Sequence, residues 1–364
     1  MSRVTLPLVT VSGTPAECGA AYGRSAADLI AGNLDEYRHR FAALAGLDPA
    51  EVRRAGAGFR ATTHELQPRI AAMLDAVAEG AGVPAEEVYA LNARTELLAV
   101  QWAGTECTAV GVLDSHTDSG HTVLGQNWDW DPAYRPYVLL LATRDERGFA
   151  VVTMVEAGMV AKSGLNSAGL GVCVNLIGCD RDGGPGGLPY HVLVRAALES
   201  DSLGAALRAT AGAPRSASIN LLLGQAGPPP GGGEVMDLEL VPGHFGVRHP
   251  VDGVLTHANH IESALPVRDR MQDEPGSSLF RADRAARLLR RADPVTRKDL
   301  VALFADHGGF PYAICRHVDE RDPVELRSES VCSILLDLDE RRMSVASGPP
   351  CGGEYVDLVL DELF

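Results

Sequence analysis

A cysteine stands at the point where the texture of the sequence changes, in the stretch Thr-Glu-Cys-Thr-Ala-Val at residues 105–110. Before Cys107 the sequence is Ala-rich with helical spacing, and after it come short apolar runs typical of strands. If the chain were cut before Cys107, that residue would carry a thiol nucleophile together with a free α-amine. An α-amine has an ordinary pKa of about 7.7–8.0, so it could act as the base for the thiol. The alternative is a small buried cysteine in a strand, which is what most free cysteines are.

Three other polar residues stand at or after apolar runs and could take part in the same chemistry. The side-chain amide of Asn259 could donate a hydrogen bond to the oxyanion of an acyl-transfer reaction. Asp129 ends an acidic and aromatic run, where it could instead cap a turn while Trp128 packs in the core. Arg316 follows an apolar run and would need a carboxylate partner if it is buried.

Several other site classes are disfavoured. The sequence has no Gly-x-Ser-x-Gly motif and no GxxxxGK[ST] motif, which argues against a serine α/β-hydrolase and a P-loop. The glycine run at 183–187 precedes a helical pattern but lacks a flanking Lys, Ser or Thr, so a loop is the better interpretation. The run His-Ala-Asn-His at 257–260 suggests metal ligands, yet no nearby Asp, Glu or Cys completes a site. We therefore expect neither a metal nor a cofactor.

Composition and charge restrict the partners. The 364 residues are 46% hydrophobic and 22% charged with a net charge of −16, which argues against a nucleic-acid partner. No apolar run is long enough to span a membrane, and the first residues lack the apolar core of a signal peptide. The seven cysteines are scattered without a CxxC pair, so neither a disulfide framework nor a zinc ribbon is indicated. These features favour a cytoplasmic protein that binds small molecules.

The apolar spacing predicts an α+β protein. The first hundred residues are expected to be almost entirely helical, with helices near 14–45, 62–81 and 86–100. Five strands with short turns follow, as in an antiparallel meander: 107–113, 121–129, 137–143, 149–156 and 169–176. Helices are then expected at 190–199, 202–211, 277–291 and 295–307, and strands at 218–224, 235–240, 254–257, 331–338, 342–347 and 355–360. This order favours two antiparallel sheets covered by helical layers.

Four short motifs occur in a specific order: Gly-Gln-Asn-Trp-Asp at 125–129, Gly-Leu-Asn-Ser-Ala-Gly at 164–169, Thr-His-Ala-Asn-His at 256–260 and Ile-Cys-Arg at 314–316. With the cysteine-led strand before them, they resemble the acyl-coenzyme A:6-aminopenicillanic acid acyltransferase family of N-terminal-nucleophile (Ntn) hydrolases. The resemblance covers roughly residues 107–350. It implies an αββα sandwich over 107–364, preceded by a helical segment at 1–106 that would be a pro-segment or small subunit if the precursor cuts itself.

The resemblance also implies roles for individual residues. Cys107 would be the nucleophile and its freed α-amine the base, while Asp129 would bind that amine. Asn259 would donate to the oxyanion, and Arg316 would orient the site. Trp128, Asn175 and His257 are expected in the substrate pocket.

The bond before Cys107 departs from the family pattern. The family's best-known member cuts after glycine, whereas Glu106 precedes Cys107 here. The carboxylate of Glu106 could slow the N-to-S acyl shift or assist it. Processing at Glu106–Cys107 is therefore an expectation that needs a direct test.

The function expected from the sequence is a cysteine amidohydrolase or acyltransferase that works through an acyl-Cys107 intermediate. The partners would be a small amide or thioester as acyl donor, and water or an amine as acceptor. The sequence gives no indication of the oligomeric state. A strong coenzyme A site is not expected, because the chain has only two lysines and a net charge of −16. The Arg-rich stretch at 281–291 is predicted to be a solvent-exposed helix face. The alternative from another class is a non-catalytic acyl-ligand-binding protein of the same fold.

Overall fold

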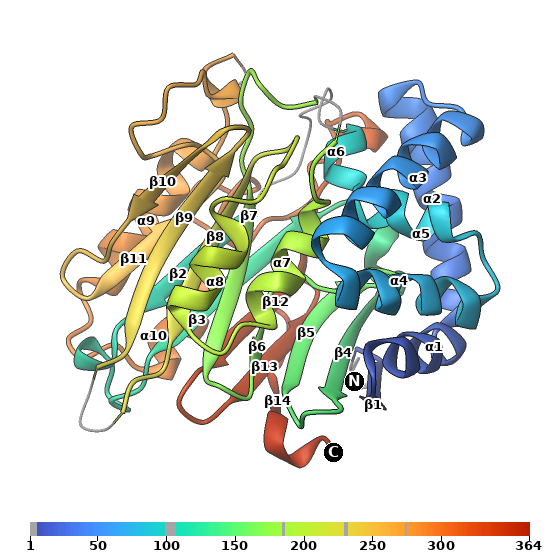
Figure 1. The fold of residues 1–364 in the computed structure, drawn as a ribbon. Coiled ribbons are helices and arrows are strands. Elements are labelled where there is room, and N and C mark those ends of the chain that lie inside the picture. The colour runs from blue at the N-terminus through green and yellow to red at the C-terminus, as the bar shows by residue number, and fades with distance from the viewer. Residues whose placement is uncertain (1–5, 99–106, 184–185, 229–231, 274) are drawn as a thin grey trace.

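The protein is an α+β sandwich in which two sheets lie face to face between helices (Figure 1). The computed structural model describes residues 6–98, 107–183, 186–228, 232–273 and 275–364. The expected αββα architecture is confirmed, because α7 and α8 cover the outer face of one sheet and α9 and α10 cover the outer face of the other.

The N-terminal part of the chain is mostly helical, as expected. Capping boxes begin two of its helices, with Thr14 and Glu17 at α1 and with Asp48 and Glu51 at α3. The expected helix at 14–45 is divided into two helices at Ala26, whose backbone leaves the helical region. The helices are α1 (Pro15–Ser25), α2 (Ala27–Ala45), α3 (Pro49–Leu66), α4 (Pro68–Ala81), α5 (Ala85–Asn92) and α6 (Arg94–Leu98).

The larger sheet has eight strands, all antiparallel except for the pair that β1 and β4 form in parallel. In spatial order they are β1 (Leu8–Gly13), β4 (Val138–Asp145), β5 (Ala150–Glu156), β6 (Gly164–Asn166), β7 (Leu170–Leu176), β8 (Ile219–Gln225), β9 (Glu234–Val241) and β10 (His244–Arg248). Strands β1, β6 and β10 were not predicted. Strand β6 has three residues and β10 is largely exposed, so neither shows a clear apolar pattern.

The smaller sheet has six strands. In spatial order they are β11 (Val254–His257), β2 (Cys107–Val112), β3 (Val123–Trp130), β12 (Glu329–Asp337), β13 (Arg342–Ser347) and β14 (Val356–Val359). The prediction of one meander from 107 to 176 is wrong, since β2 and β3 belong to this sheet and β4 to β7 belong to the other. Short turns and alternating apolar residues look the same whether consecutive strands pair or change sheets.

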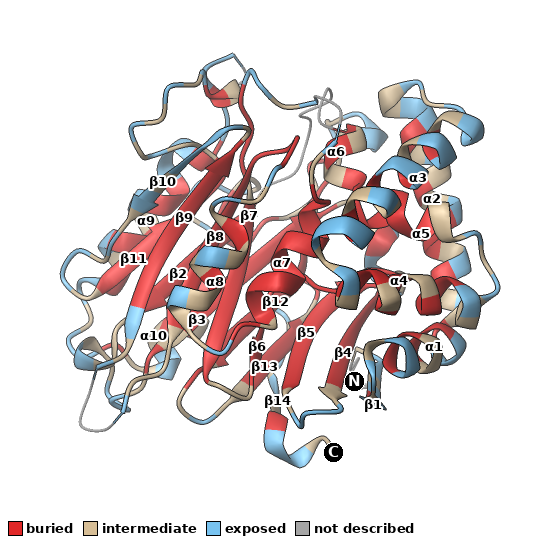
Figure 2. Ribbon diagram, in the orientation of Figure 1, coloured by how far each residue is buried: buried red, intermediate tan, exposed pale blue. Residues whose placement is uncertain are grey.

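Helices cover both outer faces of the sandwich. The larger sheet is covered by α7 (Tyr190–Leu198) and α8 (Leu203–Thr210), and the smaller one by α9 (Ser278–Leu289) and α10 (Arg297–Phe304). Short 3-10 turns lie at Asp114–His116, Pro132–Tyr137, Arg270–Gln272, Val324–Leu326 and Leu360–Glu362. Because helices and the facing sheet exclude water from both faces, all residues of β2 and β5 are buried (Figure 2).

The N-terminal helices continue the core of the sandwich. Ile30 of α2 and Leu91 of α5 are fully buried in the same hydrophobic cluster as Leu139 of β4 and Leu124 of β3. The domain boundary expected at 106/107 stays a prediction. In the described residues before it, 6–98, buried apolar side chains share one core with the sheets. None of the helices in the described residues is long and apolar enough to cross a membrane.

Candidate active site

Three neighbouring strands of the smaller sheet bring the candidate residues to one end. Cys107 is the first residue of β2 and pairs with Trp128, next to Asp129 near the end of β3. Strand β11 pairs with the other edge of β2 and ends at His257, two residues before Asn259. Antiparallel pairing places the start of β2 beside the ends of β3 and β11, so Cys107, Asp129 and Asn259 meet.

The Cys107 side chain is buried, with the backbone N–H of Asp129 as a donor to its sulfur. Burial, and then the negative charge of Asp129, raises the pKa of the Cys107 thiol to about 11. The charges of Lys162 and Arg281 oppose this rise. A thiol in this environment is protonated at neutral pH, so it needs a base before it can act as a nucleophile.

The backbone of Cys107 is held by Asn259 and Arg281. The Cys107 nitrogen donates to Asn259 Oδ1 at 2.7 Å, and Arg281 donates to the Cys107 carbonyl oxygen at 2.6 Å. Arg281 also donates to Asn259 Oδ1 at 2.8 Å, while Asn259 Nδ2 donates to the carbonyl oxygen of Leu176 at 2.8 Å. Donors on one side and an acceptor on the other fix the orientation of the amide.

Arg281 was missed by the sequence analysis, which expected the 281–291 stretch to be a solvated helix face. The guanidinium is fully buried, and its Nε donates to Ser277 Oγ at 2.9 Å. The signal was present, because Arg281 lies at helical spacing from the buried Ala285 and Leu289. An arginine on the apolar face of a helix requires polar partners inside the protein, and Cys107 and Asn259 supply them.

Asp129 and Arg316 are connected through Ser330. Asp129 is fully buried, and Ser330 Oγ, directly opposite on β12, donates to its Oδ1 at 2.7 Å. The backbone N–H of Arg316 donates to the same Ser330 oxygen at 3.0 Å, and Arg316 Nε donates to Ser328 Oγ at 2.5 Å. Ser330 therefore links the backbone of Arg316 to Asp129, and the expected role of Arg316 in orienting the site stays a prediction.

A small pocket lies against Cys107, with a cavity volume of about 30 Å³. Its lining includes Trp128, as expected, but neither Asn175 nor His257. The residues that line it are Arg94, Thr95, Cys107, Trp128, Asp129, Trp130, Lys162, Val174, Leu176 and Tyr190.

One wall of this pocket carries a buried ion cluster that the sequence analysis did not predict. Lys162 Nζ lies 2.7 Å from Glu156 Oε2 and 3.2 Å from the centre of the Trp128 ring. Arg94 lies 3.2 Å from the same Glu156 oxygen. Burial lowers the pKa of Lys162 to about 7, although Glu156 favours its charged form. Lys162 is one of two lysines and follows an apolar run, a signal that could have indicated a buried cation.

Asn175 and His257 lie between the sheets. Asn175 Nδ2 donates to the His257 carbonyl oxygen at 3.4 Å, and His257 Nε2 lies 2.9 Å from Glu239 Oε1. His260 Nδ1 lies 2.8 Å from Ser278 Oγ. The two histidines of the 257–260 run thus have different partners.

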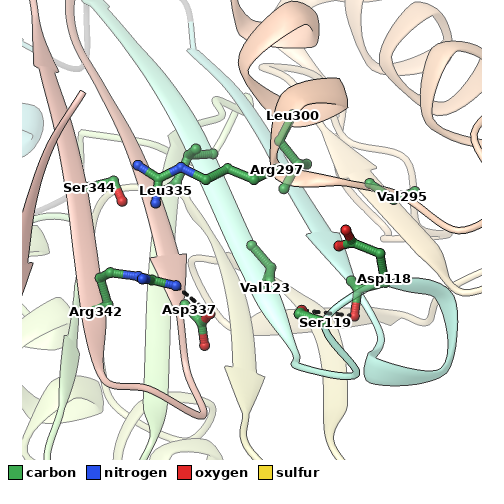
Figure 3. Close-up of a pocket in the computed structure, with 11 residues that line it drawn as sticks. Asp118, Ser119, Val123, Val295, Arg297, Leu300, Leu335, Asp337, Arg342 and Ser344 are labelled. Atoms are coloured by element: carbon green, nitrogen blue, oxygen red, sulfur yellow. Dashed lines mark hydrogen bonds and ion pairs between the residues drawn. The ribbon is translucent and has the colours of Figure 1, made fainter. Parts of the chain in front are cut away.

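A second pocket lies at the other end of β3 (Figure 3). Val123, which begins β3, lines it, and none of the predicted site residues does. Its arginines are paired with carboxylates, Arg342 with Asp337 at 3.2 Å and Arg297 with Asp357 at 2.6 Å. Because these arginines pair with protein carboxylates, their charges are balanced without a ligand.

The model of the acyl-coenzyme A:6-aminopenicillanic acid acyl-transferase family matches residues 115–351. The chain belongs to this family. The match contains Asp129, Asn259 and Arg316 and begins after Cys107, and Glu106 lies outside the described residues.

A relative of this family member is the acyl-coenzyme A:6-aminopenicillanic-acid-acyltransferase 40 kDa form of Emericella nidulans, with 29% identity over 94% of this chain and 92% of the relative. Among solved structures, a variant of conjugated bile acid hydrolase from Clostridium perfringens is similar, with a TM-score of 0.45, 11% identity, and 70% of this chain and 93% of that chain covered. Penicillin V acylase from Agrobacterium tumefaciens is similar at a TM-score of 0.43 and 12% identity, covering 70% of this chain and 87% of that chain.

Proposed function

We propose that this family member is a cysteine amidohydrolase or acyltransferase that processes itself before Cys107 and works through an acyl-Cys107 intermediate. One observation supports the proposal above all. The Cys107 residue that begins β2 lines a pocket, while its nitrogen and carbonyl oxygen are held by Asn259 and Arg281. This arrangement supports the proposal because it holds the nitrogen that would become the α-amine and places the thiol of the same residue at a pocket.

The reaction follows from these positions. The freed α-amine of Cys107 removes the thiol proton, and the sulfur attacks the carbonyl carbon of the donor. The tetrahedral intermediate then expels the leaving amine or thiol, which takes up the proton from the Cys107 ammonium. Water or an acceptor amine attacks acyl-Cys107 in the second half, with the α-amine again taking the proton. The second tetrahedral intermediate then breaks its C–S bond, and the released Cys107 sulfur takes the proton back from the ammonium.

Asn259 can bind both the α-amine of Cys107 and the oxyanion of the intermediate. Its oxygen accepts from the Cys107 nitrogen, and one hydrogen of its Nδ2 is used by Leu176. An amide nitrogen carries two hydrogens, so the second can be donated to the oxyanion as it forms. Asp129, buried beside the site, supplies the negative charge that favours an ammonium at Cys107.

We infer that the donor is a small amide or peptide-like compound and that coenzyme A thioesters are poor donors. Arg94 and Lys162 in the pocket both pair with the buried carboxylate of Glu156. A coenzyme A site needs cations that are available to phosphates, and both cations among the described residues of this lining are already held by Glu156. The aromatic side chains of Trp128 and Tyr190 suit an apolar acyl group.

Processing is tested by the mass of the purified protein. We expect two segments, residues 1–106 and 107–364, because the Cys107 sulfur would attack the carbonyl carbon before it. Cys107→Ala should stay whole, and Cys18→Ala, which removes a buried cysteine that does not line the pocket, should be cut normally. Cleavage of Cys107→Ala, or an intact wild-type chain whose Cys107 gains no acyl mass from any donor, would contradict the proposal.

The same mass measurement distinguishes the donors and acceptors. The protein is incubated with an amide panel and an acyl-coenzyme A panel, each with and without added amines. Acyl-Cys107 should form faster from amides. Faster acylation from the thioesters, with product formed only when an amine is present, would instead identify an acyltransferase that uses coenzyme A donors.

Asn259→Ala should lower the acylation rate by about 10²–10³, the usual cost of losing one oxyanion donor. Acylation is measured by single-turnover kinetics, and circular dichroism checks the fold. Asn220→Ala is the matched control, because it removes a fully buried amide that bonds Asp237 in the larger sheet. Near-normal acylation by a folded Asn259→Ala variant would assign Asn259 to structure alone.

A further inference from the structure

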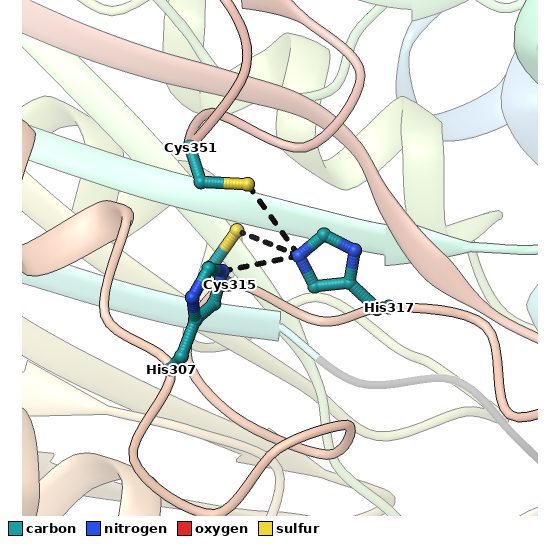
Figure 4. Close-up of side chains that lie close together, drawn as sticks. All are labelled: His307, Cys315, His317 and Cys351. Carbon is teal, nitrogen blue, oxygen red and sulfur yellow. Dashed lines mark hydrogen bonds between the residues drawn. The ribbon is translucent and has the colours of Figure 1, made fainter.

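Four side chains from three separate segments converge on the surface next to the Arg316 segment (Figure 4). His307 comes from the loop after α10, Cys315 and His317 flank Arg316, and Cys351 lies in the turn after β13. Each offers one nitrogen or sulfur ligand atom, and all four atoms lie within 4.8 Å of one another. Two thiols and two imidazoles are the ligand set of a closed zinc site.

The three distances from His317 Nε2 to the other ligand atoms are close to the edges of a tetrahedron around one ion. With Zn–S of about 2.3 Å and Zn–N of about 2.0–2.1 Å, a regular tetrahedron has S···N edges of about 3.5 Å and an N···N edge of about 3.3 Å. The sulfur atoms of Cys315 and Cys351 lie 3.6 and 3.5 Å from His317 Nε2. The Nε2 atoms of His307 and His317 are 3.1 Å apart, slightly closer than the ideal edge.

The surroundings allow an ion to enter and to be held. Cys315 is buried and His317 half-buried, whereas His307 and Cys351 are exposed, so one side of the cluster opens to solvent. The ring of Phe310 packs against both imidazoles, with centroid distances of 5.9 Å to His307 and 5.4 Å to His317. An aromatic ring beside the imidazoles restricts their orientation.

We propose that His307, Cys315, His317 and Cys351 form a structural Zn²⁺ site. Four protein ligands complete the tetrahedral shell and leave no position for substrate, which makes the site structural and not catalytic. Binding converts both thiols to thiolates and releases their protons to solvent, so the two thiolates neutralise the ion. The sequence analysis expected no metal, because these ligands are spread over 45 residues without a CxxC pair.

The proposed site joins two loops and a turn around Arg316. Backbone bonds already order this region, from Cys315 to the Asp306 carbonyl at 2.9 Å and from His317 to the Pro311 carbonyl at 3.0 Å. An ion that binds both neighbours of Arg316 would fix the segment whose N–H donates to Ser330, the partner of Asp129. The proposal stands on the ligand geometry and does not depend on the proposed reaction.

The test is metal analysis of the full-length protein, purified without chelator or affinity metal, by inductively coupled plasma mass spectrometry. We expect close to one zinc per chain, and at least a tenfold loss in both His307→Gln and Cys351→Ser. These residues are exposed, so their replacement should leave the fold intact by circular dichroism. The matched control is His64→Gln, which replaces an exposed histidine outside the cluster that contacts Asp75. This variant should keep its zinc.

Cobalt substitution tests the geometry. The protein stripped of metal and reloaded with Co²⁺ should show the intense visible bands of a tetrahedral ion and thiolate-to-metal charge transfer, and Cys351→Ser should lose part of the charge-transfer intensity. Failure to bind added Zn²⁺ or Co²⁺ under reducing conditions would overturn the proposal, as would metal content unchanged in both variants. A disulfide between Cys315 and Cys351 in the freshly purified protein, found by peptide mass mapping, would also overturn it.

Discussion

At the scale of single residues, the buried cation Arg281 organises the site. Its guanidinium donates to the carbonyl oxygen of Cys107, the hydroxyl of Thr108 and Oδ1 of Asn259. With Ser277 Oγ it serves four acceptors, which a planar group with five N–H donors can do and a lysine with three donors cannot. Its charge also favours the thiolate form of Cys107. Arg281 is therefore a positioning residue that also contributes electrostatically.

Replacing Arg281 should affect both stability and the titration of Cys107. In Arg281→Ala the acceptors lose charged donors, so the free energy of unfolding should fall by about 2–3 kcal/mol. Loss of the positive charge should also move the pH–rate profile of Cys107 acylation to higher pH, and Arg281→Lys should restore part of that shift. Urea unfolding measures the change in stability, and acylation rates at a series of pH values measure the shift of the profile.

The control is Arg287→Ala, on the exposed face of the same helix. It should change neither stability nor the profile. An Arg281→Ala variant that loses stability but keeps the wild-type profile would show that Arg281 has no electrostatic effect on the thiol.

At the scale of elements, an ion pair connects the two sheets beside the site. His257 ends β11 of the smaller sheet and contacts Glu239 of β9 in the larger sheet, with both side chains fully buried. Burial alone would lower the pKa of His257, but the charges of Asp237 and Glu239 together raise it to about 9. The Glu239 carboxyl stays ionised, with its pKa held near 2 by His257 against the effect of burial.

This pair predicts a pH dependence of stability. A histidine whose pKa is raised on folding stabilises the protein fully below its unfolded pKa of about 6.5 and loses that contribution as pH rises through about 9. The free energy of unfolding should therefore fall by up to about 3 kcal/mol between pH 6 and pH 9.5. Urea titrations at a series of pH values measure it.

His257→Gln should flatten this dependence, while His64→Gln on the surface should leave it unchanged. If the slope between pH 6 and pH 9.5 is the same in His257→Gln and in the wild type, the inter-sheet pair does not determine it.

At the scale of the whole molecule, the N-terminal segment is part of the sandwich. Strand β1 pairs with β4, and several buried side chains of the helices bond the loop after β5. Tyr22 accepts from Gly158 N at 2.8 Å, Asn33 donates to the Ala157 carbonyl at 2.8 Å, and Asn92 donates to the Gly158 carbonyl at 2.9 Å. Separation of the segment would expose these groups and the shared apolar core.

We therefore expect that segments 1–106 and 107–364 stay together after cleavage. They should elute as one species in gel filtration under native conditions and separate only in denaturant. The reason is that neither segment alone can bury the apolar core that they share. Uncleaved Cys107→Ala gives the reference elution volume. Separate elution of the two segments without denaturant would show that the interface is weaker than the structure implies.

The sequence alone determined the α+β composition of the fold and predicted several residues of the candidate site. Local signals such as the capping box at Thr14 and the alternation after Cys107 predicted most helices, most strands and the α+β class, because these depend on neighbouring residues. Most of α3, at Pro49–Leu66, was missed. Ordered motifs indicated the family and identified Cys107, Asp129 and Asn259 as a group, and the strand pairing then brought these three residues to one end of the smaller sheet.

Tertiary structure alone decided which strands share a sheet and which distant charges meet. The meander failed at β4 because a turn does not specify whether the next strand pairs or crosses to the other sheet. The cations Arg281 and Lys162 reach the Cys107 site from a helix and from a loop that are remote in sequence. The sequence also did not predict the convergence of His307, Cys315, His317 and Cys351. Their contacts depend on how three segments pack and not on the spacing of the four residues in the sequence.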